Sequence, residues 1–231
     1  MIEQEALQAK LETGLVEMGL QVSAEKQAKL IAYLLLIYKW NKVHNLTAVR
    51  DPLDMVTLHL LDSLSVLPYI QQVDAKYLLD VGAGAGLPSI PLAICLPELQ
   101  VTAIDAVHKK TSFMRQVKGE LGLSNFHVET GRVEALKKGP LNKDSLDKSP
   151  RFDVIISRAF SEIALFIKLT KHLLADNGQW FAMKGLPPQL ELANLESIGL
   201  DVSATKVIPL QVAGLQAERH LVFLQPRIFT K

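Results

Sequence analysis

The sequence predicts an α/β fold, a doubly wound and mostly parallel seven-stranded sheet with a helical segment in front of it. Three observations support this prediction. From Tyr77 onward, short apolar runs alternate with stretches of helical periodicity, as in parallel sheets covered by helices. Before Tyr77 the periodicity is helical alone. The chain has 231 residues, which is enough for one large α/β domain and an added piece.

Residues 1–75 are expected to form an N-terminal helical cap. Apolar side chains recur at close to helical spacing over residues 2–20. Ser23 is expected to mark the start of a second helix. This helix is rich in Leu, Ile, Ala and Tyr and is expected to run to about Trp40.

A third helix is expected after a stretch of turn formers at residues 41–50. Asp51 is a candidate N-cap, and Pro52 suits the first turn because that turn needs no N–H donor there. This helix is expected to stop before Pro68, since proline interrupts the backbone hydrogen bonds of a helix.

Residues 76–231 are expected to form the sheet domain. The strand candidates are 77–81, 101–105, 126–129, 153–157, 179–184, 202–208 and 220–225, and the helix candidates are 88–95, 108–122, 132–137, 161–174 and 188–198. No long helix separates the last two strands, so we expect them to pair as an antiparallel hairpin at one edge. The polar stretch 137–151 is expected to be a mobile loop.

The most informative stretch is YLLDVGAGAGLPSIPLAICLP, residues 77–97. An apolar run reaches Asp80, and glycines follow at positions 82, 84 and 86 before Pro88 and an apolar segment. This order predicts a strand, a glycine loop and a helix. Glycines let the backbone come close to a ligand, and the start of a helix presents unpaired N–H groups.

The glycine spacing excludes two nucleotide-binding motifs. A dinucleotide fingerprint needs glycine at its sixth position, which Leu87 occupies here. The P-loop needs a Gly-Lys-Ser/Thr ending, which is missing. The pattern D-x-G-x-G-x-G instead resembles the first motif of class I S-adenosylmethionine-dependent methyltransferases, whose cofactor has no pyrophosphate.

Asp105 is a candidate ligand of a ribose. It ends the next strand candidate and follows Gly82 by 23 residues. An acid about 20 residues after the glycine loop is placed to accept hydrogen bonds from ribose hydroxyls. Asp105 is also a candidate N-cap of the following helix, and the two roles are compatible.

Composition restricts the cellular compartment of the protein and the kinds of site that it can contain. The single cysteine, Cys95, excludes an internal disulfide and a cysteine-based metal site, which fits a reducing cytoplasm. The N-terminus is acidic and has no apolar core, so we expect no signal peptide. The apolar run from Leu30 to Tyr38 is too short to span a bilayer, and no membrane association is expected. The six histidines show no metal-ligand spacing, so no metal site is expected.

Charge is distributed unevenly along the chain. Residues 1–75 hold six basic and nine acidic residues, whereas residues 107–151 hold ten basic and five acidic residues, a net of +5. A basic surface beside the cofactor strands could meet phosphate. A solvated face with a flexible loop explains the same charges equally well.

Several longer segments resemble one family far more specifically than the glycine motif does. They are KWNKVHNLTAVRD at 39–51, HLLDSL at 59–64, LLDVGAGAGLPSIPLAI at 78–94, FMRQ at 113–116, GRVE at 131–134, FDVIISRAF at 152–160, MKG at 183–185 and ERHLV at 218–222. Together they resemble the glucose-inhibited division protein B family (RsmG), the bacterial 16S ribosomal RNA guanine-N7 methyltransferases. The resemblance covers nearly the whole chain and implies a Rossmann-like methyltransferase domain behind the cap.

The resemblance implies a set of residues that bind S-adenosylmethionine. Gly82 and Leu87 line the cofactor site, and Val133 and Glu134 lie beside the adenine. Arg158 also belongs to the cofactor site, with an orienting role or a role toward the RNA. The motif itself adds Asp80, Gly84 and Gly86, and Asp105 matches the ribose acid by position.

The resemblance also implies a partner, 16S ribosomal RNA or the small ribosomal subunit. The cap and the basic residues Lys109, Lys110, Arg115 and Lys184 are the expected RNA-facing surface. Phe160 is a candidate to stack on a splayed base, although core packing explains it slightly better. We expect a cytoplasmic monomer.

Guanine N7 is a lone pair without a proton to lose, so methyl transfer to it needs no general base. It needs proximity and alignment. No catalytic residue of the Ser-His-Asp or Cys-His kind is therefore expected. Two alternatives stay open at this point, namely a methyltransferase that acts on a small molecule and a non-enzymatic regulator that binds RNA or the cofactor.

Overall fold

The computed structural model describes residues 4–136, 151–197 and 202–227. One seven-stranded sheet has the order β3-β2-β1-β4-β5-β7-β6. The strands are β1 Tyr77–Val81, β2 Gln100–Asp105, β3 Phe126–Thr130, β4 Phe152–Arg158, β5 Leu174–Lys184, β6 Val202–Pro209 and β7 His220–Pro226. Strand β7 runs antiparallel to both β5 and β6, and the other neighbours are parallel. The predicted sheet and its terminal hairpin are confirmed.

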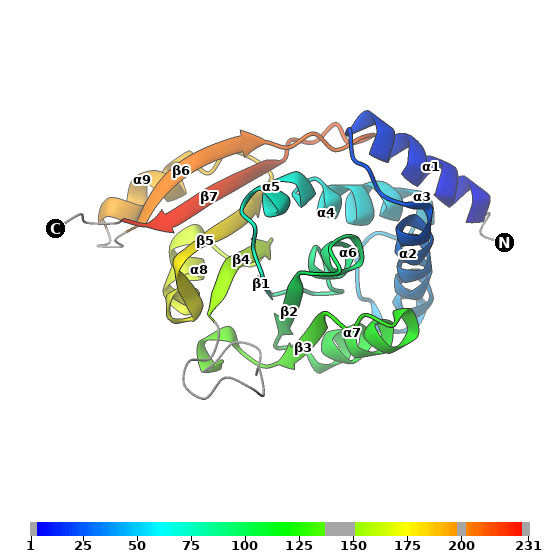
Figure 1. Cartoon of the computed structure of the whole chain (residues 1–231), viewed down its shortest axis with the longest axis horizontal. Helices are drawn as coiled ribbons and strands as arrows, with labels where there is room; N and C mark the ends of the chain where they lie inside the picture. Colours follow the sequence, from blue (N-terminus) through cyan, green and yellow to red (C-terminus); the bar gives the residue numbers. More distant parts are fainter. Residues whose placement is uncertain (1–3, 137–150, 198–201, 228–231) are drawn as a thin grey trace.

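Helices cover both faces of the sheet. Helices α6 Ser89–Cys95 and α7 His108–Leu121 lie on one face, between the sheet and the cap. Helices α8 Ile163–Thr170 and α9 Gln189–Ser197 lie on the other face, on the side away from the cap (Figure 1). Short 3₁₀ turns occur at Val133–Ala135 and Lys171–Leu173.

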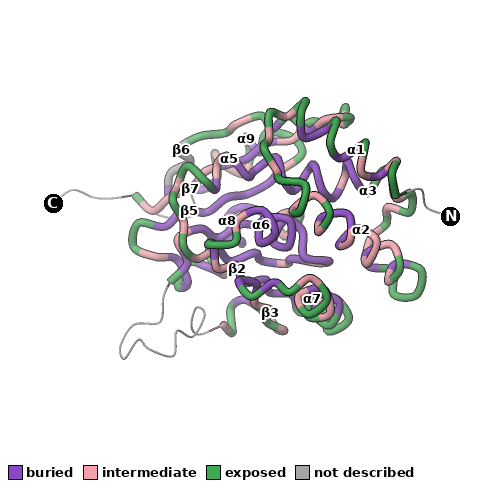
Figure 2. Tube along the Cα trace, turned by 45° about the vertical axis from the view of Figure 1, so that its right-hand side comes forward, coloured by how far each residue is buried: buried purple, intermediate pink, exposed green. Residues whose placement is uncertain are grey.

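The alternation of strand side chains explains this double-sided packing. In β1, Leu78 belongs to the apolar core shared with the cap, and Leu79 belongs to the core under α8. In β4, Val154 and Ile155 divide in the same way. All four side chains are almost fully buried, and Figure 2 shows the central strands as a buried layer inside more exposed helices. Apolar side chains on both faces are typical of parallel strands.

The cap begins with α1 Gln4–Glu17 and α2 Ala24–His44. Ser23 caps α2 as predicted, since its hydroxyl accepts a hydrogen bond from the N–H of Lys26. Helix α2 runs four residues beyond the predicted end at Trp40 and stops at Asn45, which has a left-handed backbone conformation. The core of the cap is continuous with the core of one sheet face. The division into residues 1–75 and 76–231 stays a prediction.

The segment Pro52–Gln72 differs from the prediction in one respect. It consists of α3 Pro52–Met55, a π-helical turn Val56–Leu61, α4 Asp62–Leu64 and α5 Leu67–Gln72. Asp51 caps its start, as predicted, by accepting from the N–H of Leu53. The predicted stop before Pro68 is confirmed, since α4 ends at Leu64. The prediction did not include α5, in whose first turn Pro68 lies, where its missing N–H costs nothing.

By length and composition alone, Pro52–Gln72 would also be able to cross a membrane, with a mean hydropathy of 1.2. However, 72% of that window is buried inside the protein, as in the central helix of a soluble protein. Within the described residues, no other helix meets the same test.

The remaining elements agree with the sequence within a few residues. Strand β5 begins five residues before its predicted start, and its pairing with β4 is irregular between Phe152 and Val154. The predicted helix 161–174 divides into α8 and a 3₁₀ turn. The predicted mobile loop 137–151 lies outside the described residues, except for Arg151.

Candidate active site

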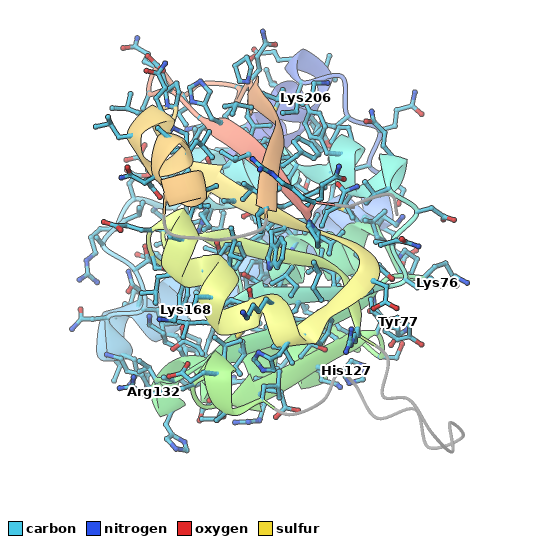
Figure 3. The ribbon with its side chains drawn as sticks, turned by 90° about the vertical axis from the view of Figure 1, so that its left-hand side faces the viewer. Lys76, Tyr77, His127, Arg132, Lys168 and Lys206 are labelled. Atoms are coloured by element: carbon cyan, nitrogen blue, oxygen red, sulfur yellow. The ribbon has the colours of Figure 1, made fainter. Side chains whose placement is uncertain are left out.

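A pocket of about 380 Å³ opens at the carboxyl edge of the sheet. Figure 3 shows the two edges: Lys76, Tyr77 and His127 lie on one side of the view, at the starts of β1 and β3, and Arg132 lies on the other side, just after β3. The pocket is lined by Val81, Gly82, Ile104, Asp105, Ala106, Lys110, Gly131, Arg132, Val133, Glu134, Ala159, Phe160 and Leu169. Ligands of open α/β sheets bind in this position, beyond the carboxyl ends of the strands.

The glycine loop forms one wall of the pocket. Gly82, Gly84 and Gly86 all have positive φ angles, of 71°, 62° and 90°. At Gly82 an added Cβ would lie 2.6 Å from Cδ2 of Phe160, so this glycine lets the ring pack closely over the loop. The N–H groups of Gly82 and Ala83 donate to the carbonyl of Ile104 and so attach the loop to β2. Gly82 lines the pocket, whereas Gly84 and Gly86 are not among its lining residues.

Asp105 lies at the rim of the pocket with its carboxylate almost buried. Its Oδ2 accepts from the N–H of Gly84 at 2.9 Å, and its Oδ1 accepts from the N–H of Val107 at 2.9 Å. Nζ of Lys110 lies 3.7 Å from Oδ2. Asp105 thus joins the glycine loop to the residue that precedes α7. The prediction that Asp105 is the N-cap of this helix was wrong, because Val107 occupies that position and no side chain caps the helix. Each carboxylate oxygen of Asp105 has a second lone pair, which leaves room for the predicted hydrogen bond from a ribose hydroxyl.

The GRVE segment forms the opposite wall. The N–H of Gly131 donates to the backbone carbonyl of Asp105, which holds the ends of β2 and β3 together. Val133 presents an apolar surface and is almost fully buried, and Glu134 is exposed at the rim. Nη1 of Arg132 lies 3.7 Å from Oε1 of Glu134. A flat apolar wall beside a carboxylate suits an adenine with an exocyclic amine.

Two predicted cofactor residues are buried behind the loop instead of lining the pocket. Asp80 is completely buried, and its Oδ2 accepts from the N–H of Ser89 at the start of α6. Burial raises the pKa of Asp80 to about 6, and hydrogen bonding from Ser89 and the charge of Arg158 oppose this rise. Leu87 is also buried and belongs to the core shared with the cap. Both residues therefore shape the glycine loop and the helix that follows it.

Arg158 turns away from the pocket toward the cap. Its Nη1 donates to Oδ2 of Asp62 at 2.7 Å and to the carbonyl of Leu58 at 3.3 Å. Arg219 also binds this carboxylate, with its Nε 2.7 Å from Oδ1 of Asp62. Sequence reasoning missed Arg219, although it lies in the ERHLV segment, which supported the family resemblance.

His59 and Asp62 are three positions apart in one helical segment, but they have different hydrogen-bond partners. Nε2 of His59 lies 3.0 Å from the hydroxyl of Thr47, and Asp62 binds the two arginines. The reason is local: Val56–Leu61 is a π-helical turn, so the spacing of a regular α-helix does not apply there. Burial lowers the pKa of His59 to about 4.

The predicted RNA-facing lysines and arginine have different surroundings. Lys109 is exposed, whereas Lys110 lines the pocket beside Asp105. Nη2 of Arg115 donates to the hydroxyl of Thr130. Lys184 forms an ion pair with Glu191 at 2.9 Å, so its charge is largely compensated.

Phe160 contacts the core and also faces the pocket. It packs edge-on against Phe166, with ring centroids 6.3 Å apart, and it also lines the pocket. Among the described residues, no group of three or more His, Cys, Asp or Glu side chains is arranged to hold a metal ion. The pocket therefore offers an apolar ring, a carboxylate at each wall and a close-packed glycine loop, which together fit a nucleoside with an attached polar tail.

Comparisons with solved structures agree with this fold. An O-methyltransferase from Bacillus cereus, crystallised in complex with SAH, matches with a TM-score of 0.55 and 16% identity, covering 94% of this chain and 100% of that one. An O-methyltransferase structure from Klebsiella pneumoniae matches with a TM-score of 0.54 and 14% identity, covering 85% and 90%. At these identities the likeness concerns the fold alone.

Sequence comparisons identify the family. The chain is 58% identical over 223 residues to ribosomal RNA small subunit methyltransferase G of Methylobacillus flagellatus, covering 96% of this chain and 100% of that protein. It is 48% identical to the protein of the same name from Neisseria gonorrhoeae, covering 94% and 98%. The family model for GidB, described as rRNA small subunit methyltransferase G, matches residues 26–222. The chain therefore belongs to the rRNA small subunit methyltransferase G family.

Proposed function

We propose that this protein transfers the methyl group of S-adenosylmethionine to N7 of a guanine in small-subunit ribosomal RNA. The observation that carries the proposal is the pocket at the carboxyl edge, in which Gly82, Asp105 and Glu134 come together from the carboxyl ends of β1, β2 and β3. These are residues for which the family resemblance or the glycine motif implied contact with the cofactor. Family membership adds the RNA substrate, which is the one that the related proteins are named for.

The pocket residues have distinct tasks in this proposal. Asp105 would accept hydrogen bonds from the ribose hydroxyls, and Glu134 would accept one from the adenine amine beside the apolar surface of Val133. Gly82 has no side chain, so the ligand can lie close to the loop backbone across the strand ends. When bound, S-adenosylmethionine supplies a sulfonium methyl group that is already activated for in-line displacement.

The remaining task of the protein is alignment of the acceptor. Guanine N7 loses no proton on attack, so no general base is needed. Correct orientation of two reactants contributes roughly 7–11 kcal/mol in favourable cases. The acceptor would enter beside Phe160 at the open side of the pocket, where the ring also closes one edge of the cofactor site.

We further propose that the protein works as a cytoplasmic monomer without a membrane. The single cysteine fits a reducing compartment, which is also where ribosomal RNA is found in bacteria.

Methyl transfer from labelled S-adenosylmethionine tests the proposal. The substrates are small-subunit particles, and RNA extracted from them, from cells that lack this protein. Nuclease digestion of the product should release the label as 7-methylguanine from one site. The variant Asp105→Asn should lose transfer, while Asp176→Asn, at an exposed carboxylate paired with Arg151, should retain it.

Cofactor binding without transfer to either RNA substrate would contradict the proposal and favour a small-molecule acceptor. The absence of turnover on RNA and on a panel of small acceptors, with RNA binding retained, would favour a non-enzymatic regulator.

A further inference from the structure

Asp62 is a buried carboxylate that is bound by two arginines from distant parts of the chain. Arg158 ends β4 and Arg219 precedes β7, while Asp62 begins α4 in the cap. Each arginine lies 2.7 Å from a different oxygen of the carboxylate. The side chain of Asp62 is 3% exposed, whereas those of Arg158 and Arg219 are 21% and 26% exposed.

This cluster lies beside the cofactor pocket. Arg158 is followed directly by Ala159 and Phe160, which line the pocket. Arg219 is followed by His220, which pairs with Lys184 at the carboxyl end of β5. Both guanidinium groups therefore lie at the carboxyl edge of the sheet over β4 and β5, next to the glycine loop over β1. An acceptor that approaches the cofactor from that side would meet them.

The cluster has more positive charge than its carboxylate needs. One guanidinium is enough to neutralise Asp62, and the second leaves a net charge of +1 in a partly buried place. Among the described residues, Arg158 forms hydrogen bonds through Nη1 alone, to Asp62 and to the carbonyl of Leu58. Arg219 uses Nε toward Asp62 and Nη1 toward the carbonyl of Glu218. Because each guanidinium carries five N–H donors, both retain donors on their partly exposed sides.

We propose that Asp62 is a positioning residue for methyl transfer, which holds Arg158 and Arg219 so that their remaining donors receive a phosphate group of the acceptor RNA. A guanidinium recognises phosphate through a planar fork, so its orientation matters as much as its charge. Asp62 sets the orientation of both guanidinium groups, from their buried side. The proposal rests on the proposed function, since the RNA is the ligand of the two arginines.

The structure supports a rigid attachment of Asp62 in particular. The residue directly follows the π-helical turn Val56–Leu61, and its own N–H donates to the carbonyls of Thr57 and His59. The carbonyl of Leu58 in that turn accepts from the same Arg158 nitrogen that binds Asp62. Single π-helical turns within helices are frequent at functional sites. Arg158 is therefore held both by the side chain of Asp62 and by the backbone carbonyl of Leu58.

A carboxylate at the opposite edge of the sheet provides a matched control. Oδ2 of Asp153 accepts from the N–H groups of Lys76 and Tyr77, at 2.8 and 2.9 Å, and so also joins distant segments. Lys76 and Tyr77 lie on the side of the molecule away from Arg132 (Figure 3). Asp62→Asn and Asp153→Asn thus remove the same charge from two bridging carboxylates, one near the pocket and one far from it.

The experiment compares wild type, Asp62→Asn and Asp153→Asn in thermal unfolding, in binding of S-adenosylmethionine and in methyl transfer to RNA. Asp62→Asn should lower kcat/KM for RNA by on the order of 100-fold, as for a misplaced reactant, while the Kd for the cofactor changes less than about threefold. It should also flatten the salt dependence of RNA binding. Asp153→Asn should shift the Tm and leave kcat/KM per cofactor-binding molecule close to that of the wild type.

A merely structural role of Asp62 predicts something different, namely a lower Tm with unchanged transfer per cofactor-binding molecule, and that result would overturn the proposal. If Asp62→Asn does not fold, Arg219→Lys replaces it, because lysine keeps the charge and loses the fork. Loss of RNA transfer with intact cofactor affinity would then support the proposal, and unchanged transfer would overturn it. A wild-type chain that transfers no methyl to RNA overturns the proposed function as well, so the two failures are distinguishable.

Discussion

The phenolic oxygen of Tyr33 lies 2.8 Å from the carbonyl oxygen of Ala85, so that helix α2 of the cap holds the glycine loop directly. Tyr33 is completely buried, and its hydroxyl is also 3.3 Å from the carbonyl of Gly86. Burial raises the pKa of Tyr33 well above its ordinary value, so the proton stays on the oxygen and is donated at all working pH values. A buried hydrogen bond therefore joins the cap to the glycine loop.

Tyr33→Phe should weaken this connection. The substitution leaves the carbonyl of Ala85 without its buried donor, which costs roughly 1–3 kcal/mol of folding free energy. Because that carbonyl belongs to the glycine loop, the affinity for S-adenosylmethionine should fall several-fold, as measured by calorimetry. Tyr38→Phe, in a partly buried tyrosine of the same helix with a lysine over its ring, is the control and should leave the cofactor affinity unchanged.

Substitutions at two glycines of the loop should have different effects. At Gly84 an added Cβ would make only an ordinary contact, 4.0 Å from the carbonyl oxygen of Gly82, although its positive φ makes a side chain strained by roughly 1–2 kcal/mol. Gly84→Leu should therefore leave the fold intact and abolish cofactor binding. At Gly86 the same atom would overlap with the side chain of Ile90, so Gly86→Ala should mainly destabilise the protein. Unchanged cofactor affinity in folded Gly84→Leu would contradict the assignment of the loop.

Asp80 should give the folding stability a specific pH dependence. Its pKa is about 6 in the folded chain against an ordinary value of 3.8, so the folded state binds more protons between these values. Stability is then lost as the pH rises from about 4 to 6. Asp80→Asn removes this titration. The free energy of unfolding of the variant, relative to that of the wild type, should therefore rise across that window by up to about 3 kcal/mol and stay constant above pH 7.

Urea unfolding of both proteins at several pH values measures this difference in the free energy of unfolding. His59 acts in the opposite direction, because its pKa is lowered to about 4 and its contribution is lost as the pH falls from 6.5. The difference between Asp80→Asn and wild type cancels the contribution of His59. A difference that is the same at pH 4.5 and pH 7 would show that Asp80 does not titrate in this range.

Lys109 should contribute to RNA affinity through its charge. It is exposed beside the pocket, and Lys109→Ala should weaken RNA binding and reduce the slope of log affinity against log salt by about 1. Lys110 lines the cofactor pocket beside Asp105, so Lys110→Ala should also weaken cofactor binding. Lys76→Ala, at the opposite edge of the sheet, is the control (Figure 3). An unchanged slope for Lys109→Ala would exclude its face from the RNA surface.

The sequence was sufficient to predict the positions of the strands along the chain, because parallel strands buried on both faces are near-continuous apolar runs. It predicted the break before Pro68 but not the new helix α5, since a proline also fits the first turn of a helix that starts there. It also did not distinguish residues that line the pocket from those behind it. Asp80 and Gly82 are two positions apart, yet one is buried and the other faces the pocket.

The parts of the site that the sequence did not predict are tertiary contacts. Asp62 is 96 positions from Arg158 and 157 from Arg219, and no local pattern brings them together. Tyr33 lies in a helix rich in apolar residues, where a buried aromatic ring is the ordinary expectation. Its hydrogen bond to a loop 52 positions away depends on how the cap packs on α6.

The most direct test of the account is a crystal structure of the protein with S-adenosylhomocysteine bound. We predict that the ribose hydroxyls lie within hydrogen-bond distance of Asp105 and that the adenine lies against Val133 beside Glu134. The sulfur should point toward the open side near Phe160, with Arg158 and Arg219 still bound to Asp62. A ligand that binds away from this pocket, or whose sulfur faces away from Phe160 and the arginine cluster, would contradict the account.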